Sequence, residues 1–366
     1  MKKIIVRCSL FFLILPLFAY AGNDGERVEK KINRVFNIQS DGVVILENKY
    51  GNLDIAIGNN NEVKMNVTIS VETSSEKKAQ EALDRITIKF EEGNNRVKAT
   101  TEIESTSGWL SWFNTCKLEM EINYQVLVPA DVFLELTNKY GDIYVESSNK
   151  NMKIDLAYGN IRLGDINSNL NLDMSYSEGN ISQMHDGTIQ LSYSNLEMED
   201  ANDVTVNNKY AELSTGSLHK LYMESSYSNL HAVSIGQLDY NGKYDDVIIE
   251  HAGSINAETG YTGITVEEFE GTGHFDMRYG DLNIQNIHHG FSKIDVNTSY
   301  TGVALGFNPD ASYTVDAETN YCDINHPDLK ITEDSQRESR ATLKGSRGSG
   351  GGEVIARMNY GELNID

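Results

Sequence analysis

The stretch TNKYGDI, residues 137–143, decides the fold of this chain because close copies of it recur along almost the whole sequence. Clear examples are NKYGNLDI from Asn48 and MRYGDLNI from Met277. From Tyr140 to Tyr279 the tyrosines follow one another at steps of 17 or 18 residues. A fixed period of this length is typical of solenoid proteins. The tyrosines that mark the copies are Tyr50, Tyr140, Tyr158, Tyr176, Tyr193, Tyr210, Tyr227, Tyr244, Tyr261, Tyr279, Tyr300, Tyr321 and Tyr360.

Each copy has the pattern of a strand, a corner and a second strand. Apolar residues stand six and four positions before the tyrosine, as Leu134 and Leu136 do before Tyr140, which is the period of a strand with one buried face. The tyrosine has the same parity, so we expect its ring to face inward and to form a structural ladder; the alternative is an outward row of rings that binds sugar chains. A small or turn-prone residue such as Gly141 follows and provides the bend, and an apolar residue such as Ile143 resumes the buried face.

A unit of this size cannot bury its inner face alone, so neighbouring coils must stack about 4.8 Å apart with parallel strands. The sequence therefore predicts an all-β, single-stranded β-solenoid with coils of about 17–18 residues. Right-handed winding is favoured because crossovers between parallel strands have that hand. A propeller or a sandwich would need units of about 40 residues or antiparallel hairpin signals, which this sequence lacks.

The amino-terminal residues have the pattern of an export signal: basic residues, an apolar run and the small-residue site Ala19-Tyr20-Ala21. Two interruptions of the repeat define the other segments. Before Tyr140 the sequence predicts strands and one helix near residues 73–86, an α+β excursion that would cap the open end of the solenoid. The expected segments are a signal peptide over 1–21, a spacer over 22–40, a first coil with the capping excursion over 41–139, repeats over 140–325, and a strand pair, glycine loop and last coil over 326–366.

The chain is strongly acidic, with a formal net charge of −23 that becomes about −26 once the signal is removed. Such a field disfavours nucleic acid and anionic membrane surfaces as partners. No second apolar run is long enough to span a bilayer, so we expect no integral membrane segment after signal cleavage. Cys116 and Cys322 remain after cleavage, and the sequence leaves their pairing open.

The stretch YQVLVPADVFLELTNKYGDIYV, residues 124–145, followed by repeated coils, resembles the adhesin family of exported bacterial β-solenoid repeat proteins. That family carries a domain of unknown function and is related to the head domains of auto-transporter adhesins. The resemblance covers residues 41–366 and implies the solenoid fold and a role in surface interactions. It provides no catalytic residues. This chain departs from the family pattern by placing a tyrosine before the Gly-Asp-Ile position in every coil.

Carboxylates are the best candidates for chemistry. In stacked coils Asp155 would lie near Asp173, and Glu258 near Asp276, close enough for acid–base catalysis or for holding a cation. The outward-facing residues are similar in every coil, however, whereas an active site should be one irregular place. An ordinary solvent-exposed strand face is therefore favoured over a catalytic or cation site. The histidines lack zinc-site spacing, so we expect no metal and no cofactor. The carboxylates three positions before a tyrosine are Glu47, Asp155, Asp173, Glu224, Glu258, Asp276 and Glu318.

One polar stretch, STSGWLSWFNTC, contains four large apolar side chains: Trp109, Leu110, Trp112 and Phe113. They suit a contact surface for a partner or glycan, and they suit equally a cap over the end of the solenoid.

The sequence favours a non-enzymatic, exported, adhesin-like repeat protein that mediates surface or envelope interactions with a protein or a glycan. It would reside in the periplasm, on the outer surface or in the medium. The alternative is a carbohydrate-active enzyme of the polysaccharide lyase or glycosidase type on a β-helix scaffold. The sequence does not indicate an oligomeric state.

Overall fold

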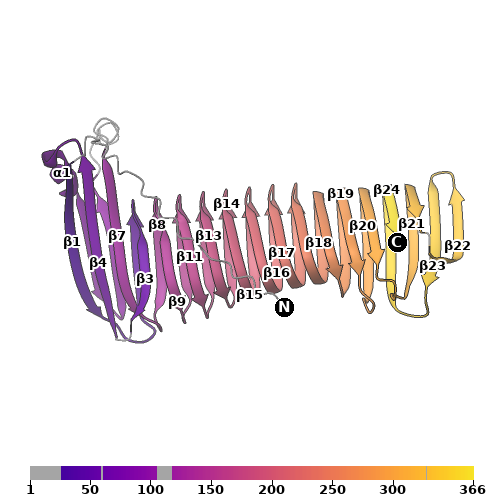
Figure 1. The fold of residues 1–366 in the computed structure, drawn as a ribbon, viewed down its shortest axis with the longest axis horizontal. Helices are drawn as coiled ribbons and strands as arrows, with labels where there is room; N and C mark the ends of the chain where they lie inside the picture. Colours follow the sequence, from indigo (N-terminus) through magenta and orange to yellow (C-terminus); the bar gives the residue numbers. More distant parts are fainter. Residues whose placement is uncertain (1–25, 59–60, 105–117, 327) are drawn as a thin grey trace, which may run out of the picture.

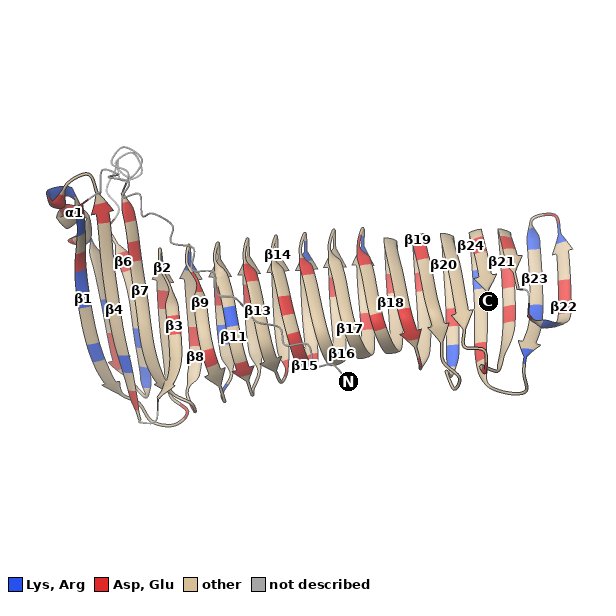
Figure 2. Ribbon diagram, in the orientation of Figure 1, with Lys and Arg blue, Asp and Glu red and all other residues tan. Residues whose placement is uncertain are grey.

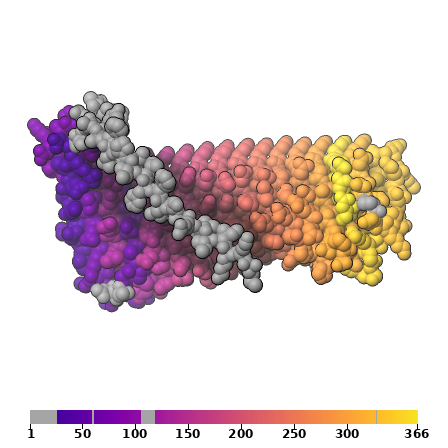
Figure 3. Space-filling model, viewed as in Figure 1, coloured from indigo at the N-terminus to yellow at the C-terminus, as the bar shows by residue number. Residues whose placement is uncertain are grey.

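The computed structural model describes residues 26–58, 61–104, 118–326 and 328–366, which form one long β-solenoid (Figure 1). Strands dominate, and the described residues contain a single helix. Coils follow one another along the long axis of the molecule, and Figure 3 shows them as evenly spaced rows. The predicted all-β solenoid with coils of about 17–18 residues is confirmed.

A regular coil consists of two strands joined at a tyrosine corner, as β10 (Met152–Ala157) and β11 (Asn160–Ile166) are at Tyr158. The first strand pairs in parallel with its equivalents β8 (Phe133–Lys139) and β12 (Leu170–Ser175), and the second pairs with β9 (Ile143–Ser148) and β13 (Glu178–Met184). Alternate side chains such as Ile154 and Leu163 are buried between the two stacks. The solenoid is therefore a flat, two-sided structure with a continuous apolar core.

The turns opposite the tyrosine corners become shorter towards the middle of the chain and are longer again after β19. From β15 to β17, a single strand contains the second half of one coil and the first half of the next. β15 (Asn195–Lys209), for example, pairs with β13 through its first half and with β14 (Gly187–Ser192) through its second half. β16 (Glu212–Ser226) and β17 (Asn229–Lys243) repeat this arrangement, and β18 (Asp246–Phe269) continues through the next corner at Tyr261. β19 (Thr272–Ile287) and β20 (Lys293–Phe307) each contain both halves of one coil, with the corner at Tyr279 and at Tyr300.

The amino-terminal end is broader than the rest (Figure 1). β2 (Val43–Lys49) and β3 (Leu53–Gly58) form the first coil, and longer antiparallel strands extend the sheet beyond it. The segment 22–40, expected as a spacer, contains β1 (Glu26–Asn37), which pairs with β4 along its whole length. The remaining elements of this end are β4 (Glu62–Thr73), α1 (Glu76–Leu83), β5 (Ile86–Gly93), β6 (Arg96–Ile103) and β7 (Glu119–Pro129).

The carboxy-terminal end departs from sequence order. β21 (Tyr313–Asn325) does not pair with β20, because β24 (Gly352–Ile365) lies between them and pairs in parallel with both. The hairpin of β22 (Lys330–Arg337) and β23 (Arg340–Arg347) covers the other side of β21 in antiparallel fashion. The coil that is last in the sequence is thus not last in space.

Charged side chains cover the outer faces, and acidic residues outnumber basic ones along the solenoid (Figure 2). The edge strands β1 and β22 carry both Lys or Arg and Glu, which discourages uncontrolled edge pairing. No helix in the described part of the chain is long and apolar enough to cross a membrane. Cys322 carries a free thiol, and Cys116 lies outside the described residues.

Candidate functional site

The tyrosines of the repeat share one unusual backbone conformation. All thirteen are left-handed, with φ between 51° and 62°. Sterics make this region costly for residues other than Gly, by about 1–2 kcal/mol. The sequence predicted the bend at the small residue after the tyrosine, but the tyrosine itself is the left-handed corner.

This conformation reverses the direction of the side chain. The parity of the repeat predicts rings that face inward, and that prediction is wrong: twelve of the thirteen tyrosines are 41–61% exposed, and Tyr50 is half-buried. The alternation before the corner continues inward only to the residue two before the tyrosine, such as Asn138, which is buried. The left-handed residue then breaks the alternation and turns its ring outward.

The outward rings stack on one another along one narrow edge of the solenoid. Neighbouring centroids are 4.6–5.2 Å apart, and the ring planes differ by at most 19°. The order in space follows the sequence up to Tyr300 and then passes through Tyr360 to Tyr321. Twelve steps of about 4.8 Å give a row of roughly 58 Å, which we call the tyrosine strip.

Small polar side chains fix the corner from inside. The Ser194 hydroxyl donates to the backbone oxygen of Ser192 at 2.9 Å and accepts the N–H of Ser177 from the preceding coil at 3.1 Å. Ser177 repeats the bond within its own coil, to Ser175 at 2.9 Å. These bonds satisfy buried backbone groups at the bend and connect one coil to the next.

A basic row flanks the strip on one side. The residue before each tyrosine is Lys, Arg or a small or neutral residue, and never an acid. The Lys139 ammonium lies 5.0 Å from the ring centroid of Tyr140 and 5.6 Å from that of Tyr158, which is cation–π geometry. The cations of this row are Lys49, Lys139, Lys209, Lys243 and Arg278.

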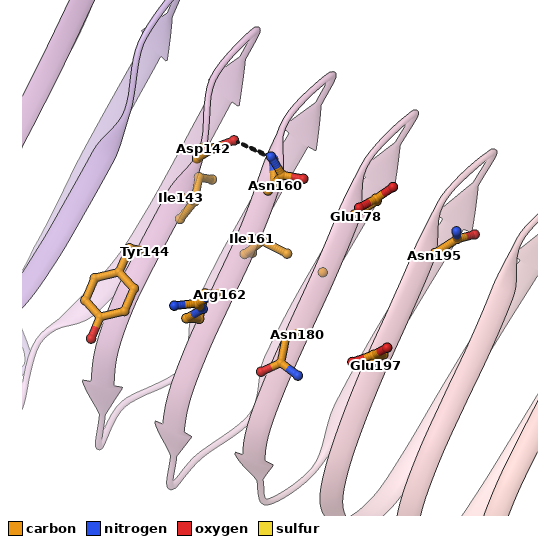
Figure 4. Close-up of a pocket in the computed structure, with 11 residues that line it drawn as sticks. Asp142, Ile143, Tyr144, Asn160, Ile161, Arg162, Glu178, Asn180, Asn195 and Glu197 are labelled. Atoms are coloured by element: carbon orange, nitrogen blue, oxygen red, sulfur yellow. Dashed lines mark hydrogen bonds between the residues drawn. The ribbon is translucent and has the colours of Figure 1, made fainter. Parts of the chain in front are cut away.

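An alternating row flanks the strip on the other side, two residues after each tyrosine. From Asn52 to Asp246, Asn and acidic residues alternate, so the carboxylates of this part stand about 9.6 Å apart, two coils from one another. In later coils Gly263 and Gly302 occupy the position. Asp142 Oδ1 accepts both the backbone N–H and the side-chain amide of Asn160, at 2.7 and 2.9 Å (Figure 4). The sequence predicts these residues as part of the bend, and their alternation is also visible in the sequence but was not predicted. Its strictly alternating part is Asn52, Asp142, Asn160, Glu178, Asn195, Glu212, Asn229 and Asp246.

A shallow groove of about 580 Å³ lies beside this row on the outer face of β9, β11, β13 and β15 (Figure 4). Tyr144, Arg162, Asn180 and Glu197 form its second line of side chains. A groove of about 550 Å³ lies elsewhere on the surface, against β8, β10, β12 and β14. Both grooves lie on outer strand faces, where the side chains differ from coil to coil.

The carboxylates considered for chemistry lie on exposed strand faces. Asp155 and Asp173 are in register on neighbouring coils, as are Glu258 and Asp276. Partial burial, and then the charge of Asp155, raise the pKa of Asp173 above its usual range. Glu47 instead accepts a bond from Lys98 at 2.7 Å, which lowers its pKa. Within the described ranges, no group of His, Cys, Asp and Glu side chains could hold a metal ion.

One corner differs from the others on its buried side. Asp245 occupies the position that is Ser, Thr, Ala or Gly in most coils, and its carboxylate is buried. It accepts the N–H of Ser228 and the hydroxyl of the buried Tyr240, each at 2.9 Å. Burial is the main cause of a raised pKa for both Asp245 and Tyr240.

The second candidate surface from the sequence cannot be placed. Trp109, Leu110, Trp112 and Phe113 lie outside the described residues. Whether they form a contact surface or a cap stays a prediction.

Comparison with known proteins identifies relatives of the whole solenoid. Residues 48–366 match the family described as Toastrack DUF4097. No curated protein matches the sequence. Among solved structures, the chain is similar to a proposed cell adhesion protein from Clostridium sporogenes (11% identity, 92% of this chain and 99% of the other, TM-score 0.23). It is also similar to a proposed adhesin from Bacteroides fragilis (8%, 92% and 97%, 0.25) and a proposed lipid-binding protein from Parabacteroides distasonis (11%, 76% and 93%, 0.24).

Proposed function

The chain belongs to the Toastrack DUF4097 family, and we propose that it is a non-enzymatic, exported, adhesin-like protein that binds a partner in the envelope or on a cell surface through its tyrosine strip. The signal-like amino terminus supports export. The family resemblance of the repeat supports a role in surface interactions.

The observation that carries this proposal is the continuity of the strip. Twelve of the tyrosines are 41–61% exposed as residues, which gives roughly 100 Å² each and over 1,000 Å² in all, hydroxyl groups included. The largest apolar patch on an ordinary monomer is about 300–600 Å², and larger patches mark interaction sites. Phenylalanine would stack equally well, so the hydroxyl retained on every ring suits a surface that alternates between water and a partner.

The stacking geometry favours a protein partner over a glycan. Sugars bind aromatic side chains mainly through the ring face, and here each interior face is covered by the next ring at 4.6–5.2 Å. The strip therefore presents ring edges and hydroxyl groups at intervals of about 4.8 Å. The edges of aromatic rings have a partial positive charge, and each hydroxyl group can both donate and accept a hydrogen bond. Both properties suit the backbone and polar side chains of a protein surface.

Replacing four neighbouring rungs tests the proposal. Asparagine tolerates the left-handed conformation, so a variant with Asn at Tyr176, Tyr193, Tyr210 and Tyr227 removes rings without forcing the corner. The control replaces Asn167, His185, Asn202 and His219 by Ser at the opposite edge of the solenoid. Binding to a panel of purified envelope proteins and to a glycan array is measured for both, with circular dichroism to verify the fold.

We expect the wild-type chain and the control to bind the same protein, and the strip variant to lose at least tenfold in affinity. Equal binding by the strip variant would refute the role of the strip. Binding confined to glycans, and lost in the strip variant, would retain the site and change the class of partner.

A second candidate function, glycoside cleavage, is favoured by one observation, the raised pKa of Asp173 beside Asp155. A carboxylic acid with a raised pKa next to a second carboxylate is the arrangement of a glycosidase. Polysaccharide turnover that is abolished by Asp173→Asn and by Asp155→Asn, but not by Asp276→Asn, would establish it. If none of the glycans bound in the array is cleaved, glycoside cleavage is refuted as a function of this protein.

A further inference from the structure

The strand β24 occupies a slot between two coils that are consecutive in the sequence. It pairs in parallel with β20 on one side and with β21 on the other, along almost its whole length. Its ring, Tyr360, completes the tyrosine strip, at 4.8 Å from Tyr300 and 4.8 Å from Tyr321. β20 and β21 therefore depend on an inserted strand for their facing edges.

Both ends of β24 are also held. The Gly352 N–H donates to the backbone oxygen of Ser312 at 3.0 Å. At the other end, the Asp366 oxygen accepts the Phe307 N–H at 2.9 Å. Between these points the side chains of Val354, Ala356, Met358, Leu363 and Ile365 are buried in the core. The slot is thus specific for the register and apolar pattern of β24.

The segment that delivers β24 is short and built from glycine. β23 ends at Arg347 on the outer side of β21, and residues 348–351 carry the chain past the start of β21 to its inner side. The two positions are about two strand spacings, or 9.6 Å, apart. Gly348, Gly350 and Gly351 have φ of 70°, 80° and 106°, and a Cβ on Gly351 would lie 1.7 Å from the Ser312 oxygen. Such a tight crossing is the usual hinge of strand exchange.

We propose that β24 is an exchangeable strand, and that the slot between β20 and β21 also accepts β24 from a second copy of this chain. Mutual exchange would give a closed two-fold dimer in which two solenoids are joined at their carboxy-terminal ends. The occupant is a second copy because the register, the tyrosine and the five buried side chains are all encoded in β24 itself. This dimer goes beyond the proposed function and does not require the tyrosine strip to bind a partner.

The closed monomer and the exchanged dimer differ little in the contacts that β24 makes. β24 makes the same contacts in the closed monomer and in the exchanged dimer, so the two differ only in the crossing at 348–351 and in the entropy of association. Protein concentration during folding therefore decides between them. Once inserted, β24 is paired on both sides, so later exchange requires the loss of both ladders and is slow.

Cross-linking between two variants tests the proposal. Ala304 on β20 and Asn364 on β24 are in register. One variant carries Ala304→Cys and the other Asn364→Cys, each with Cys8, Cys116 and Cys322 replaced by Ser. The two are unfolded, mixed, refolded at low or high concentration, and treated with a short bismaleimide. A chain with both substitutions is the control and should cross-link within itself at low concentration.

We expect a cross-linked dimer after mixed refolding at high concentration, at least tenfold more abundant than at low concentration. Its absence, while the doubly substituted chain cross-links internally, would overturn the proposal. The proposal would also be overturned if folded chains, mixed without unfolding, gave the same yield of cross-linked dimer as the refolded mixture. Such a dimer would come from a contact between surfaces and not from strand exchange.

A change in hinge length provides a second test that does not depend on cross-linking. Deletion of Ser349, Gly350 and Gly351 leaves one residue, whose reach of about 7 Å is shorter than the separation of about 9.6 Å that the closed monomer requires, so light scattering should report twice the monomer mass. Insertion of four Gly or Ser residues at the same place is the matched control and should give monomers. A folded, monomeric deletion variant would overturn the proposal.

Discussion

The rings of Tyr300 and Tyr360 stack with centroids 4.8 Å apart, although β21 and the hairpin of β22 and β23 separate the two residues in the sequence. Tyr321, the next tyrosine of the repeat, stacks on the other face of Tyr360. Neighbours in the strip are therefore determined by strand insertion as well as by the repeat.

Double-mutant cycles with Tyr→Asn substitutions should reproduce this order. We expect a coupling free energy of about 0.5–1.5 kcal/mol for Tyr300 with Tyr360 and for Tyr360 with Tyr321, since each pair shares a stacked face. The coupling of Tyr300 with Tyr321 should be near zero. Chemical denaturation measures all three. Strong coupling of Tyr300 with Tyr321 alone would mean that β24 lies elsewhere.

Substitutions at one interior rung separate stacking from backbone strain. Tyr193 stacks on Tyr176 at 4.9 Å and on Tyr210 at 5.0 Å, with φ of 52°. Tyr193→Asn should lower the free energy of unfolding by about 1–3 kcal/mol through two lost stacks. Tyr193→Phe should change it by less than about 0.5 kcal/mol, because the hydroxyl faces solvent. Tyr193→Val should cost more than Asn, because a β-branched residue is strained at this φ.

Denaturant unfolding of the three variants provides the measurement. If Tyr193→Asn were as stable as the wild-type chain, stacking would not explain why tyrosine occupies a left-handed position in every coil.

The repeat could be predicted from the sequence, but the direction of its tyrosines could not. Alternation identifies the buried face only while every residue is extended, and a left-handed residue shifts the phase by one. Glycine or asparagine would have marked such a position, whereas tyrosine does not. The shift was visible in Ile143, three residues after Tyr140, but it could equally be assigned to Gly141.

The position of β24 was hidden for a related reason. Every coil has the same pattern, so the letters around Tyr360 fit beside Tyr300 as well as beyond Tyr321. The strand β1 was missed because its charged residues, such as Lys30 and Lys31, obscure the alternation on an edge that is largely exposed. Position in a stack of equivalent strands depends on the connecting loops, which periodicity does not describe.

The paired carboxylates Asp155 and Asp173 should destabilise the fold at neutral pH. The folded-state pKa of Asp173 is raised, so protonated Asp173 is favoured by folding and this stability is lost as the pH rises. Asp173→Asn should therefore increase the free energy of unfolding at pH 7 by about 0.2–1 kcal/mol, the range for like charges on adjacent strands. The gain should vanish below about pH 3, where both states are protonated.

Two further variants check the cause. Asp155→Asn should give a smaller gain, because it removes the repulsion but not the partial burial of Asp173, and the two gains should not add fully. Glu135→Gln should instead reduce stability, since Glu135 stands in register with Lys153. Full additivity of the two Asp variants would show that the pair does not interact.

The buried Asp245 should produce the clearest pH dependence in the chain. Its pKa is raised in the folded state, chiefly by burial, while the unfolded chain has an ordinary value. As the pH rises, the unfolded state loses its proton first, so stability falls between the two pKa values and is constant above them. For one proton the slope is at most about 1.4 kcal/mol per pH unit.

Asp245→Asn should remove this loss, because the amide keeps an acceptor for the Ser228 N–H and does not titrate. The advantage of the variant over the wild-type chain should therefore grow with pH, as measured by denaturant unfolding at several pH values. Tyr240→Phe should act in the opposite direction, since its hydroxyl donates to the carboxylate at 2.9 Å and favours the charged form. A difference between Asp245→Asn and the wild-type chain that does not change with pH would mean that the carboxylate is solvated in the folded protein.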